Sequence, residues 1–333
     1  MPVRNEARFI ARSLQAILTQ DYPAGRLEVI VADGLSTDGT RELVLEISKR
    51  GGPVRMIDNP GRIVSTGLNA AIRQARGEII IRVDGHCEIA GDYVRRCVTH
   101  LESGDAEAVG GSIETIGETP LARAIAVVMS SPFGVGGSAF RTVRNRTILV
   151  DTVPFPAYKR TLLDHAGPFD CELVRNQDDE YNYRLRKAGA RILLAADVRS
   201  RYYSRSTMRS LWRQYFLYGY YKVRILQKHP RQMQLRQFVP AGFACAVVVG
   251  LAASAGIPST RAAHAALLGI YLIANVLASF DTARRHGWDL LPRLPVLFAS
   301  LHLSYGMGFL LGLARFMNRW FTKAPEPPLQ SGV

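Results

Sequence analysis

The chain has 333 residues, which is enough for one large domain and an appendage. Its net charge is +14, mostly from Arg, which suits nucleic acid, anionic lipid headgroups or phosphate-bearing substrates. The cysteines Cys87, Cys97, Cys171 and Cys245 are scattered and form no CxxC pair. This pattern argues against a zinc site or a disulfide framework and favours a reducing compartment.

The N-terminal part of the chain alternates apolar strand patterns with helical ones. Helical periodicity predicts helices over 7–20, 40–49 and 65–76. Short apolar runs predict strands over 27–32, 54–57, 77–83 and 106–111. This alternation indicates an α/β fold with a doubly wound, mostly parallel sheet. No G-x-G-x-x-G follows the first strand, so an ordinary dinucleotide-binding domain is excluded.

Two of the expected strands end in acids, at the sheet edge where open α/β sheets bind ligands. The run over 77–83 is typical of a strand buried on both faces, and Asp84-Gly85-His86 follows it. A carboxylate and an imidazole at this spacing suit a divalent metal, although a polar turn would look the same. Asp33 opens a small polar turn and could accept hydrogen bonds from a base or ribose. Its structural alternative is a helix-capping loop.

A third acidic cluster lies in the second half of this region. Asp178, Asp179 and Glu180 open a helix that Gly189 closes. Acids at a helix N-terminus are favoured by the macrodipole, which is the structural alternative. That alternative does not account for three consecutive acids preceded by Gln177, so we interpret the cluster as functional.

A basic and aromatic helix is expected over 207–227. Arg205, Arg209 and Arg213 recur every four residues and form one stripe, with aromatic residues around them. This chemistry suits a membrane interface, and nucleic acid could use it as well.

Three apolar runs follow and favour the membrane over nucleic acid. The ranges 237–260, 262–280 and 294–314 contain no Asp, Glu, Lys or Arg, and each approaches the roughly 20 residues that cross a bilayer. Positive-inside counting places the N-terminal domain in the cytoplasm. It would then leave Arg315, Arg319 and Lys323 outside, so the third run is expected either to cross or to be re-entrant. We therefore expect an interfacial region over 204–236, membrane helices over 237–322 and a tail over 323–333.

Several of these motifs together resemble glycosyltransferase family 2 enzymes. They are Met1-Pro2-Val3-Arg4-Asn5-Glu6, the turn from Asp33 to Thr40, and the strand ending at Asp84, in matching order and spacing. The resemblance implies a GT-A fold over 1–203 that binds a nucleotide sugar with Mn²⁺ or Mg²⁺. It also assigns site residues. Asp33 would contact uracil. The nucleotide sugar would be bound by Pro2, Arg4, Glu6 and Asp84. The metal would be held by Asp84 and His86.

The sequence departs from the family pattern at three places. Gly34 stands where a second Asp is common, and His86 replaces the second Asp of the D-x-D motif. The Asp-x-His variant resembles the subgroup that builds succinoglycan-type exopolysaccharide. Only Met1 to Val3 correspond to the first strand, so we expect that strand to begin about six to ten residues upstream.

The resemblance extends to the catalytic and acceptor residues. Gln177-Asp178 occupies the position of the family's Glu-Asp pair, which implies Asp178 as catalytic base and Asp179 as the reserve. The segment from Gln214 to Tyr218 resembles the subgroup's counterpart of Q-x-x-R-W, although the full motif is absent. Gln177, Arg213, Gln214 and Tyr218 are therefore expected near the acceptor or diphosphate.

Taken together, these motifs predict an inverting glycosyltransferase in the inner membrane, multi-pass, with a cytoplasmic catalytic domain. It would move a sugar, expected to be glucose, from a UDP-sugar to a polyprenyl-diphosphate-linked or glycan acceptor, with no nucleic-acid partner. One alternative is a nucleotidyltransferase, which would need a Gly/Arg/Lys-rich triphosphate loop that we do not find near the N-terminus. The other is a non-catalytic membrane scaffold.

Overall fold

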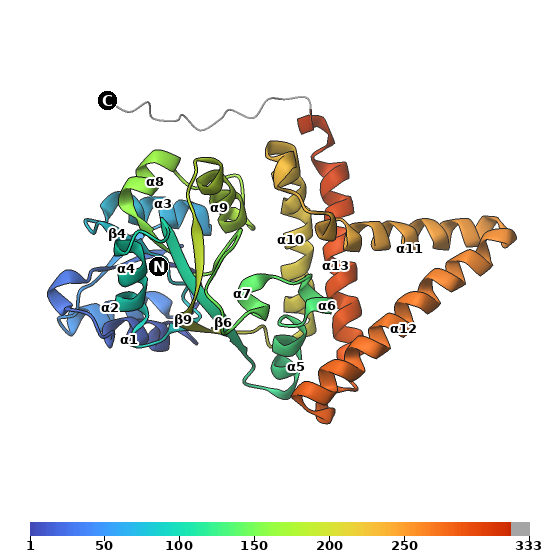
Figure 1. The fold of residues 1–333 in the computed structure, drawn as a ribbon, viewed down its shortest axis with the longest axis horizontal. Coiled ribbons are helices and arrows are strands. Elements are labelled where there is room, and N and C mark those ends of the chain that lie inside the picture. Colours follow the sequence, from blue (N-terminus) through green and yellow to red (C-terminus); the bar gives the residue numbers. More distant parts are fainter. Residues whose placement is uncertain (321–333) are drawn as a thin grey trace. The chain divides into compact units, whose positions relative to one another are not determined.

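The computed structural model describes residues 1–320, which divide into two units described separately below (Figure 1). Met1–Glu114 and Ala139–Tyr203 form an α/β unit, and Thr115–Ser138 and residues 204–320 form a helical unit. The sequence analysis places 115–138 inside the catalytic domain, whereas the structure groups this segment with the helical unit. The predicted tail over 323–333 lies outside the described residues.

The first part of the α/β unit is a parallel sheet of three strands. Its order is β1 (Pro2–Val3), β2 (Val29–Asp33) and β3 (Val54–Asp58). The helices α1 (Ile10–Leu18), α2 (Thr40–Lys49) and α3 (Val64–Gln74) alternate with these strands in the chain. Val3 pairs with Asp33, so the carboxyl ends of β1 and β2 lie together at one edge. The predicted helices and strands of this region are all found, with ends shifted by a few residues.

The second sheet of the unit is antiparallel in each strand pair for which a register is defined, which differs from the mostly parallel expectation. Its order is β4 (Ile79–Ile81), β8 (Ala157–Lys159), β6 (Ala108–Ile116), β9 (Ile192–Tyr203) and β5 (Cys87–Ile89), with β7 (Ile148–Leu149) pairing to β9. Local periodicity predicts a strand but not its partner, and β8 and β9 come from far along the chain. The three isoleucines of β4 are also only partly buried, not buried on both faces.

A hydrophobic cluster fixes the segment that leads into the acidic helix. The remaining helices of the unit are α4 (Tyr93–Glu102), α7 (Ala139–Thr142), α8 (Arg160–Ala166) and α9 (Gln177–Lys187). Phe169 stacks on Tyr181 of α9 with ring centroids 3.8 Å apart. From α3, Asn69 Nδ2 donates to Phe169 O at 2.9 Å and Ser65 Oγ donates to Leu173 O at 3.0 Å. These contacts hold the segment that precedes α9 against α3.

The helical unit contains the predicted interfacial helix and the three apolar runs. Its helices are α5 (Pro120–Val128), α6 (Pro132–Val135), α10 (Met208–Lys228), α11 (Val239–Gly256), α12 (Arg261–His286) and α13 (Leu294–Arg315). The last three, counted with their flanking turns, are long and apolar enough to cross a membrane. A bilayer-spanning helix needs about 20 apolar residues, so the predicted runs are confirmed as candidate spans.

The helix α10 is not a lone interfacial helix, because it packs lengthwise against α13 (Figure 1). A Cβ added to Gly219 would lie 1.9 Å from Tyr305 O, and one on Gly308 would lie 2.0 Å from Phe216 O. Glycine therefore lets the two backbones approach closely. Of the predicted basic stripe, Arg209 and Arg213 are exposed, whereas Arg205 is partly buried.

This packing predicts a position-specific effect of adding a single methyl group. Gly308→Ala should destabilise the protein by about 1–3 kcal/mol, because the new Cβ overlaps the backbone of α10. Gly269→Ala in α12 is the matched control, since a Cβ there meets nothing within 4 Å. Thermal unfolding of the detergent-purified variants measures both effects. Equal unfolding temperatures for the two variants would contradict the close contact between α10 and α13.

Candidate active site

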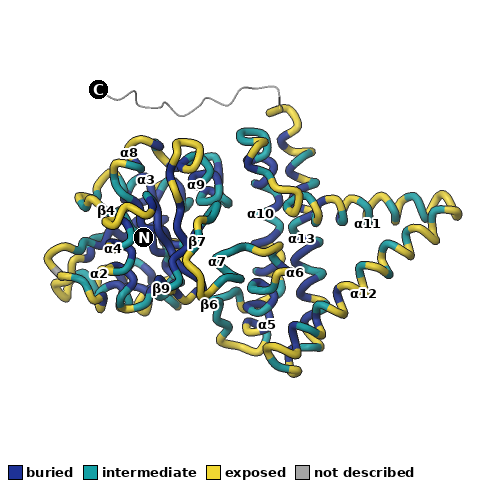
Figure 2. The backbone as a smooth tube through the Cα atoms, in the orientation of Figure 1, coloured by how far each residue is buried: buried dark blue, intermediate teal, exposed yellow. Residues whose placement is uncertain are grey.

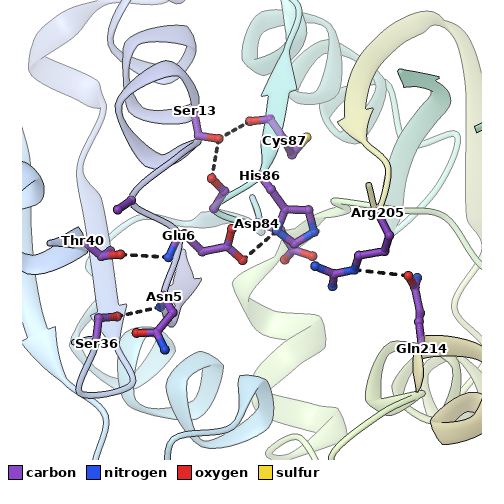
Figure 3. Close-up of polar contacts among 12 residues, drawn as sticks. Asn5, Glu6, Ser13, Ser36, Thr40, Asp84, His86, Cys87, Arg205 and Gln214 are labelled. Atoms are coloured by element: carbon purple, nitrogen blue, oxygen red, sulfur yellow. Dashed lines mark hydrogen bonds and ion pairs between the residues drawn. The ribbon is translucent and has the colours of Figure 1, made fainter. Parts of the chain in front are cut away.

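The chain after β1 is bonded to the turn after β2, which builds one polar rim at the carboxyl ends of both strands (Figure 3). Asn5, at φ +55°, donates its backbone N–H to Ser36 Oγ at 2.9 Å. Thr37 N–H donates back to Asn5 Oδ1 at 2.9 Å, and Glu6 N–H donates to Thr40 Oγ1 at 2.8 Å. A non-glycine residue in the left-handed region costs free energy, so these bonds must hold Asn5 in place.

Asp33, the predicted uracil contact, lies at this rim but is fully buried. Its Oδ2 accepts from Ser36 N at 3.0 Å and from Arg41 Nη1 at 2.6 Å, and Arg41 also pairs with Asp58 at 2.8 Å. Its Oδ1 is buried without a hydrogen-bond partner among the described residues. That oxygen is therefore an acceptor that a base N–H could satisfy.

The Gly34 departure from the family pattern has a steric counterpart in Arg4. A Cβ on Gly34 would lie 3.1 Å from Cβ and 3.2 Å from Cδ of Arg4. The Arg4 side chain thus lies against the turn where a second Asp is common in the family. Arg4 is exposed, as expected for a nucleotide contact, whereas Pro2 is buried within β1.

Glu6 pairs with His86, a contact that the sequence analysis did not foresee. His86 Nδ1 lies 2.9 Å from Glu6 Oε1 (Figure 3). Gly85 permits this approach, since a Cβ there would lie 3.0 Å from Cγ of Glu6. Ser13 of α1 holds the turn, with its Oγ 2.9 Å from Gly85 O and 2.6 Å from Cys87 O.

The Glu6–His86 pair bears on whether the site fits a metal. A histidine that ligates a metal usually bonds a carboxylate through its other ring nitrogen, and Glu6 would leave Nε2 of His86 as the donor. Among residues 1–320, no three His, Cys, Asp or Glu side chains are placed to hold an ion by themselves. An ion bound at this turn would therefore need further ligands from elsewhere, such as a diphosphate.

Arg82 joins two of the predicted acids and was not among the predicted site residues. It is buried, and it donates from Nε to Asp84 Oδ1 at 3.0 Å and from Nη2 to Oδ2 at 3.1 Å. Its Nη1 lies 3.8 Å from Oδ2 of Asp178. Burial tends to raise the pKa of Asp84, but the adjacent Arg82 cation lowers that pKa below its ordinary value. The sequence signal for this role was a single arginine within the apolar run over 77–83.

The three acids of α9 differ in burial, since Asp178 and Asp179 are partly buried and Glu180 is buried. Asp178 is 44% exposed at its side chain, and its Oδ1 accepts from Asp179 N at 3.0 Å. Glu180 is buried and forms an ion pair with Arg184 at 2.7 Å, which gives it a structural role. Gln177 is buried, and its Oε1 has no hydrogen-bond partner among the described residues. Asp178 is the acid of this cluster that forms an ion pair with Arg82, which also binds Asp84.

The predicted acceptor residues of α10 belong to the helical unit and bond among themselves. Gln214 Nε2 donates to the Tyr218 hydroxyl at 2.9 Å. Arg205 Nε donates to Gln214 Oε1 at 3.3 Å (Figure 3). Arg213, which precedes Gln214 in the chain, is exposed. Their contact with an acceptor or diphosphate remains a prediction.

Comparisons with known proteins agree with this geometry. The sequence model described as Glycosyl transferase family 2 matches residues 1–167. The succinoglycan biosynthesis protein ExoA of Rhizobium meliloti is 32% identical over 253 residues, which are 73% of this chain and 74% of that protein. A dolichyl N-acetyl-alpha-D-glucosaminyl phosphate 3-beta-D-2,3-diacetamido-2,3-dideoxy-beta-D-glucuronosyltransferase of Methanococcus voltae is 25% identical over 327 residues, covering 95% of this chain and 96% of that protein.

Among solved structures, the mannosyltransferase PcManGT from Pyrobaculum calidifontis in complex with GDP-Man and Mn²⁺ aligns with a TM-score of 0.60. The alignment has 22% sequence identity and covers 91% of this chain and 85% of that one. At this identity the likeness shows the fold alone. The expected GT-A fold with a C-terminal helical region is confirmed.

Proposed function

The chain belongs to glycosyl transferase family 2 and is a glycosyltransferase, and we propose that it moves a sugar from UDP to a lipid-linked acceptor with inversion at the anomeric carbon. Glucose is the expected sugar, and a polyprenyl-diphosphate-linked glycan is the expected acceptor. The observation that carries this proposal is the Arg82 bridge between Asp84 and Asp178. Arg82 binds Asp84, the candidate nucleotide ligand, and forms an ion pair with Asp178, the candidate base.

The proposed reaction is a single in-line displacement. Asp178 accepts the proton of the acceptor hydroxyl while the oxygen of that hydroxyl bonds to the anomeric carbon. The bond from that carbon to the diphosphate oxygen breaks, and UDP leaves with the electron pair. Asp178 suits the base role because its side chain is half exposed at the start of α9. Arg82 would keep this carboxylate oriented.

Asp84 and His86 would hold a divalent metal, with Glu6 orienting the imidazole. Such an ion, when bound, offsets negative charge on a departing diphosphate. A carboxylate and an imidazole are suitable ligands for such an ion, which supports this metal site. The Pyrobaculum calidifontis enzyme of the same fold was solved with Mn²⁺. For the present chain, we propose that the ion is Mn²⁺ or Mg²⁺.

Metal dependence gives a direct prediction. Transfer should stop in EDTA and return with Mn²⁺ at least as well as with Mg²⁺, because imidazole suits transition metals and Mg²⁺ prefers oxygen ligands. His86→Asp should shift the preference toward Mg²⁺. His100→Asp is the control, since His100 pairs with Asp197 away from this turn. Full activity in EDTA would contradict the metal site.

The expected acceptor and location follow from the anchor. The three candidate spans support a multi-pass protein of the cell membrane, and positive-inside counting supports a cytoplasmic catalytic unit. Membrane placement favours an acceptor carried by a lipid. The Methanococcus voltae relative is named as a transferase for a dolichyl-linked sugar phosphate, which is also a lipid-linked acceptor.

The proposed function is tested by mass spectrometry of lipid extracts. Membranes containing the full-length protein are given individual UDP-sugars, and the lipid-linked products are compared with membranes containing Asp178→Asn. The expected result is one added hexose per acceptor and release of UDP. Release of pyrophosphate from a nucleoside triphosphate and a sugar phosphate would instead identify a nucleotidyltransferase.

A further inference from the structure

The contacts between α10 and α13 set the level of each residue along the pair. Gly308 lies against Phe216 and Gly312 against Tyr220, with the same offset in both pairs. The two helices therefore run in the same direction. Gly219 lies against Tyr305 and Phe309, a slightly smaller offset. Arg213, three residues before Phe216, is therefore level with the middle part of α13, between about residues 299 and 305.

This register bears on whether α13 can cross a bilayer. Its 22 residues would span about 33 Å, which matches the hydrocarbon core in length. If α13 crossed, however, it would carry α10 with it. Arg213 would then lie near the bilayer centre, and Arg209 about one turn away. An arginine at that depth is costly and too far from either interface for its side chain to reach.

The helices α11 and α12, unlike α13, are little buried by the rest of the protein. They form a hairpin that extends away from α13, and most of its surface is exposed (Figures 1 and 2). Only 11% of the most apolar window of each is buried, against 56% for α13. Most of the large apolar side chains that are exposed on the three candidate spans lie on the hairpin: Val239, Val248, Val249, Leu251, Leu268, Ile270, Leu272, Ile273, Val276, Leu277 and Phe280. On α13 the exposed ones are Val296, Met307 and Leu311.

Basic residues mark the ends of this hairpin unequally. Its open end has Arg231 and Arg236 before α11 and Arg284 and Arg285 at the end of α12. Between Val239 and Asp281, Arg261 at the closed end is the only Lys or Arg, and its Nε donates to Ser254 O at 3.0 Å. The positive-inside rule places the open end in the cytoplasm.

We propose that α11 and α12 are the only two crossings among the described residues, and that the α10–α13 pair stays at the cytoplasmic face of the membrane. The partner of the hairpin surface is the hydrocarbon of the bilayer. Arg209, Arg213 and Trp212, exposed on α10, face the anionic headgroups. The chain after α13 then remains cytoplasmic, so Arg315 and Arg319 obey the positive-inside rule that three crossings would break.

The inference rests on the membrane location proposed above, and its test measures topology without using transfer. Two native cysteines are buried and two, Cys171 and Cys245, are exposed. Cys245→Ala leaves Cys171 as the accessible reporter for the catalytic unit. Adding Asn318→Cys or Ser259→Cys to a Cys171→Ser/Cys245→Ala background reports the chain after α13 and the hairpin tip. Both positions are exposed.

Each variant is treated with a membrane-impermeant maleimide in sealed vesicles of either orientation, and labelling after detergent gives the total. The expected result is that Cys171 and position 318 are labelled in the same vesicle orientation and lose labelling in the other. Position 259 should show the reverse pattern. Labelling of position 318 from the side opposite Cys171 would overturn the inference in favour of three crossings. Position 259 sharing the side of Cys171 would also overturn it. Transfer activity, measured separately in the same vesicles, shows whether the proposed function stands in either case.

Discussion

Asp178→Asn should lower the rate of sugar transfer by about 10²–10⁴-fold while UDP affinity stays within a few-fold, as expected for loss of a general base. Asparagine keeps the size of the side chain and can still accept from the N–H of Asp179, but it cannot take a proton from the acceptor. Turnover of a UDP-sugar with saturating acceptor and UDP binding by calorimetry measure the two quantities.

Asp179→Asn is the matched control, since it changes the neighbouring acid on the same turn of α9. It should leave most of the transfer rate intact. If Asp179→Asn is inactive and Asp178→Asn turns over near normally, the base is Asp179 and the assignment from the Arg82 bridge is wrong. Glu180 is not a useful comparison, because it is buried against Arg184 and its loss would disturb the fold.

The second large effect is expected at Arg82. Arg82→Ala should lower the free energy of unfolding by about 3–5 kcal/mol, because Asp84 would remain as a largely buried carboxylate without its cation. Transfer should fall as well, since both Asp84 and Asp178 lose the group that orients them. Chemical denaturation and turnover of the purified protein give the two values.

Two further variants separate charge from geometry. Arg82→Lys keeps the positive charge but not the two-point contact with Asp84, so it should recover part of the stability and less of the rate. Arg50→Ala removes an exposed pair with Glu46 and should cost less than about 1 kcal/mol. If Arg82→Ala proves no more destabilising than Arg50→Ala, the buried bridge is not a feature of the folded protein.

Patterns local in sequence predicted the N-terminal elements well. The helix over 40–49 and the acids Asp33 and Asp84 at the carboxyl ends of β2 and β4 are fixed by short-range periodicity and by the ends of apolar runs. Partners distant in sequence were not predictable in this way. Glu6 and His86 are 80 residues apart, and nothing near either one indicates the other. The antiparallel pairing of β4 with β8 has the same cause.

The helical region illustrates the same limit. The apolar runs predicted three spans by length and composition, but the glycines on α10 and α13 do not reveal that they face each other. Arg82 was missed because a single charge in an isoleucine-rich run was interpreted as part of a buried strand. In both cases the missing information was which element packs against which.

The anomeric configuration of the product tests the central claim most directly. Purified full-length protein is given a UDP-α-sugar and acceptor, and the new glycosidic linkage is assigned by proton NMR. A single displacement assisted by Asp178 predicts a β-linked product, because attack from the face opposite the diphosphate inverts the carbon. An α-linked product would contradict that mechanism and with it the assignment of Asp178 as the base.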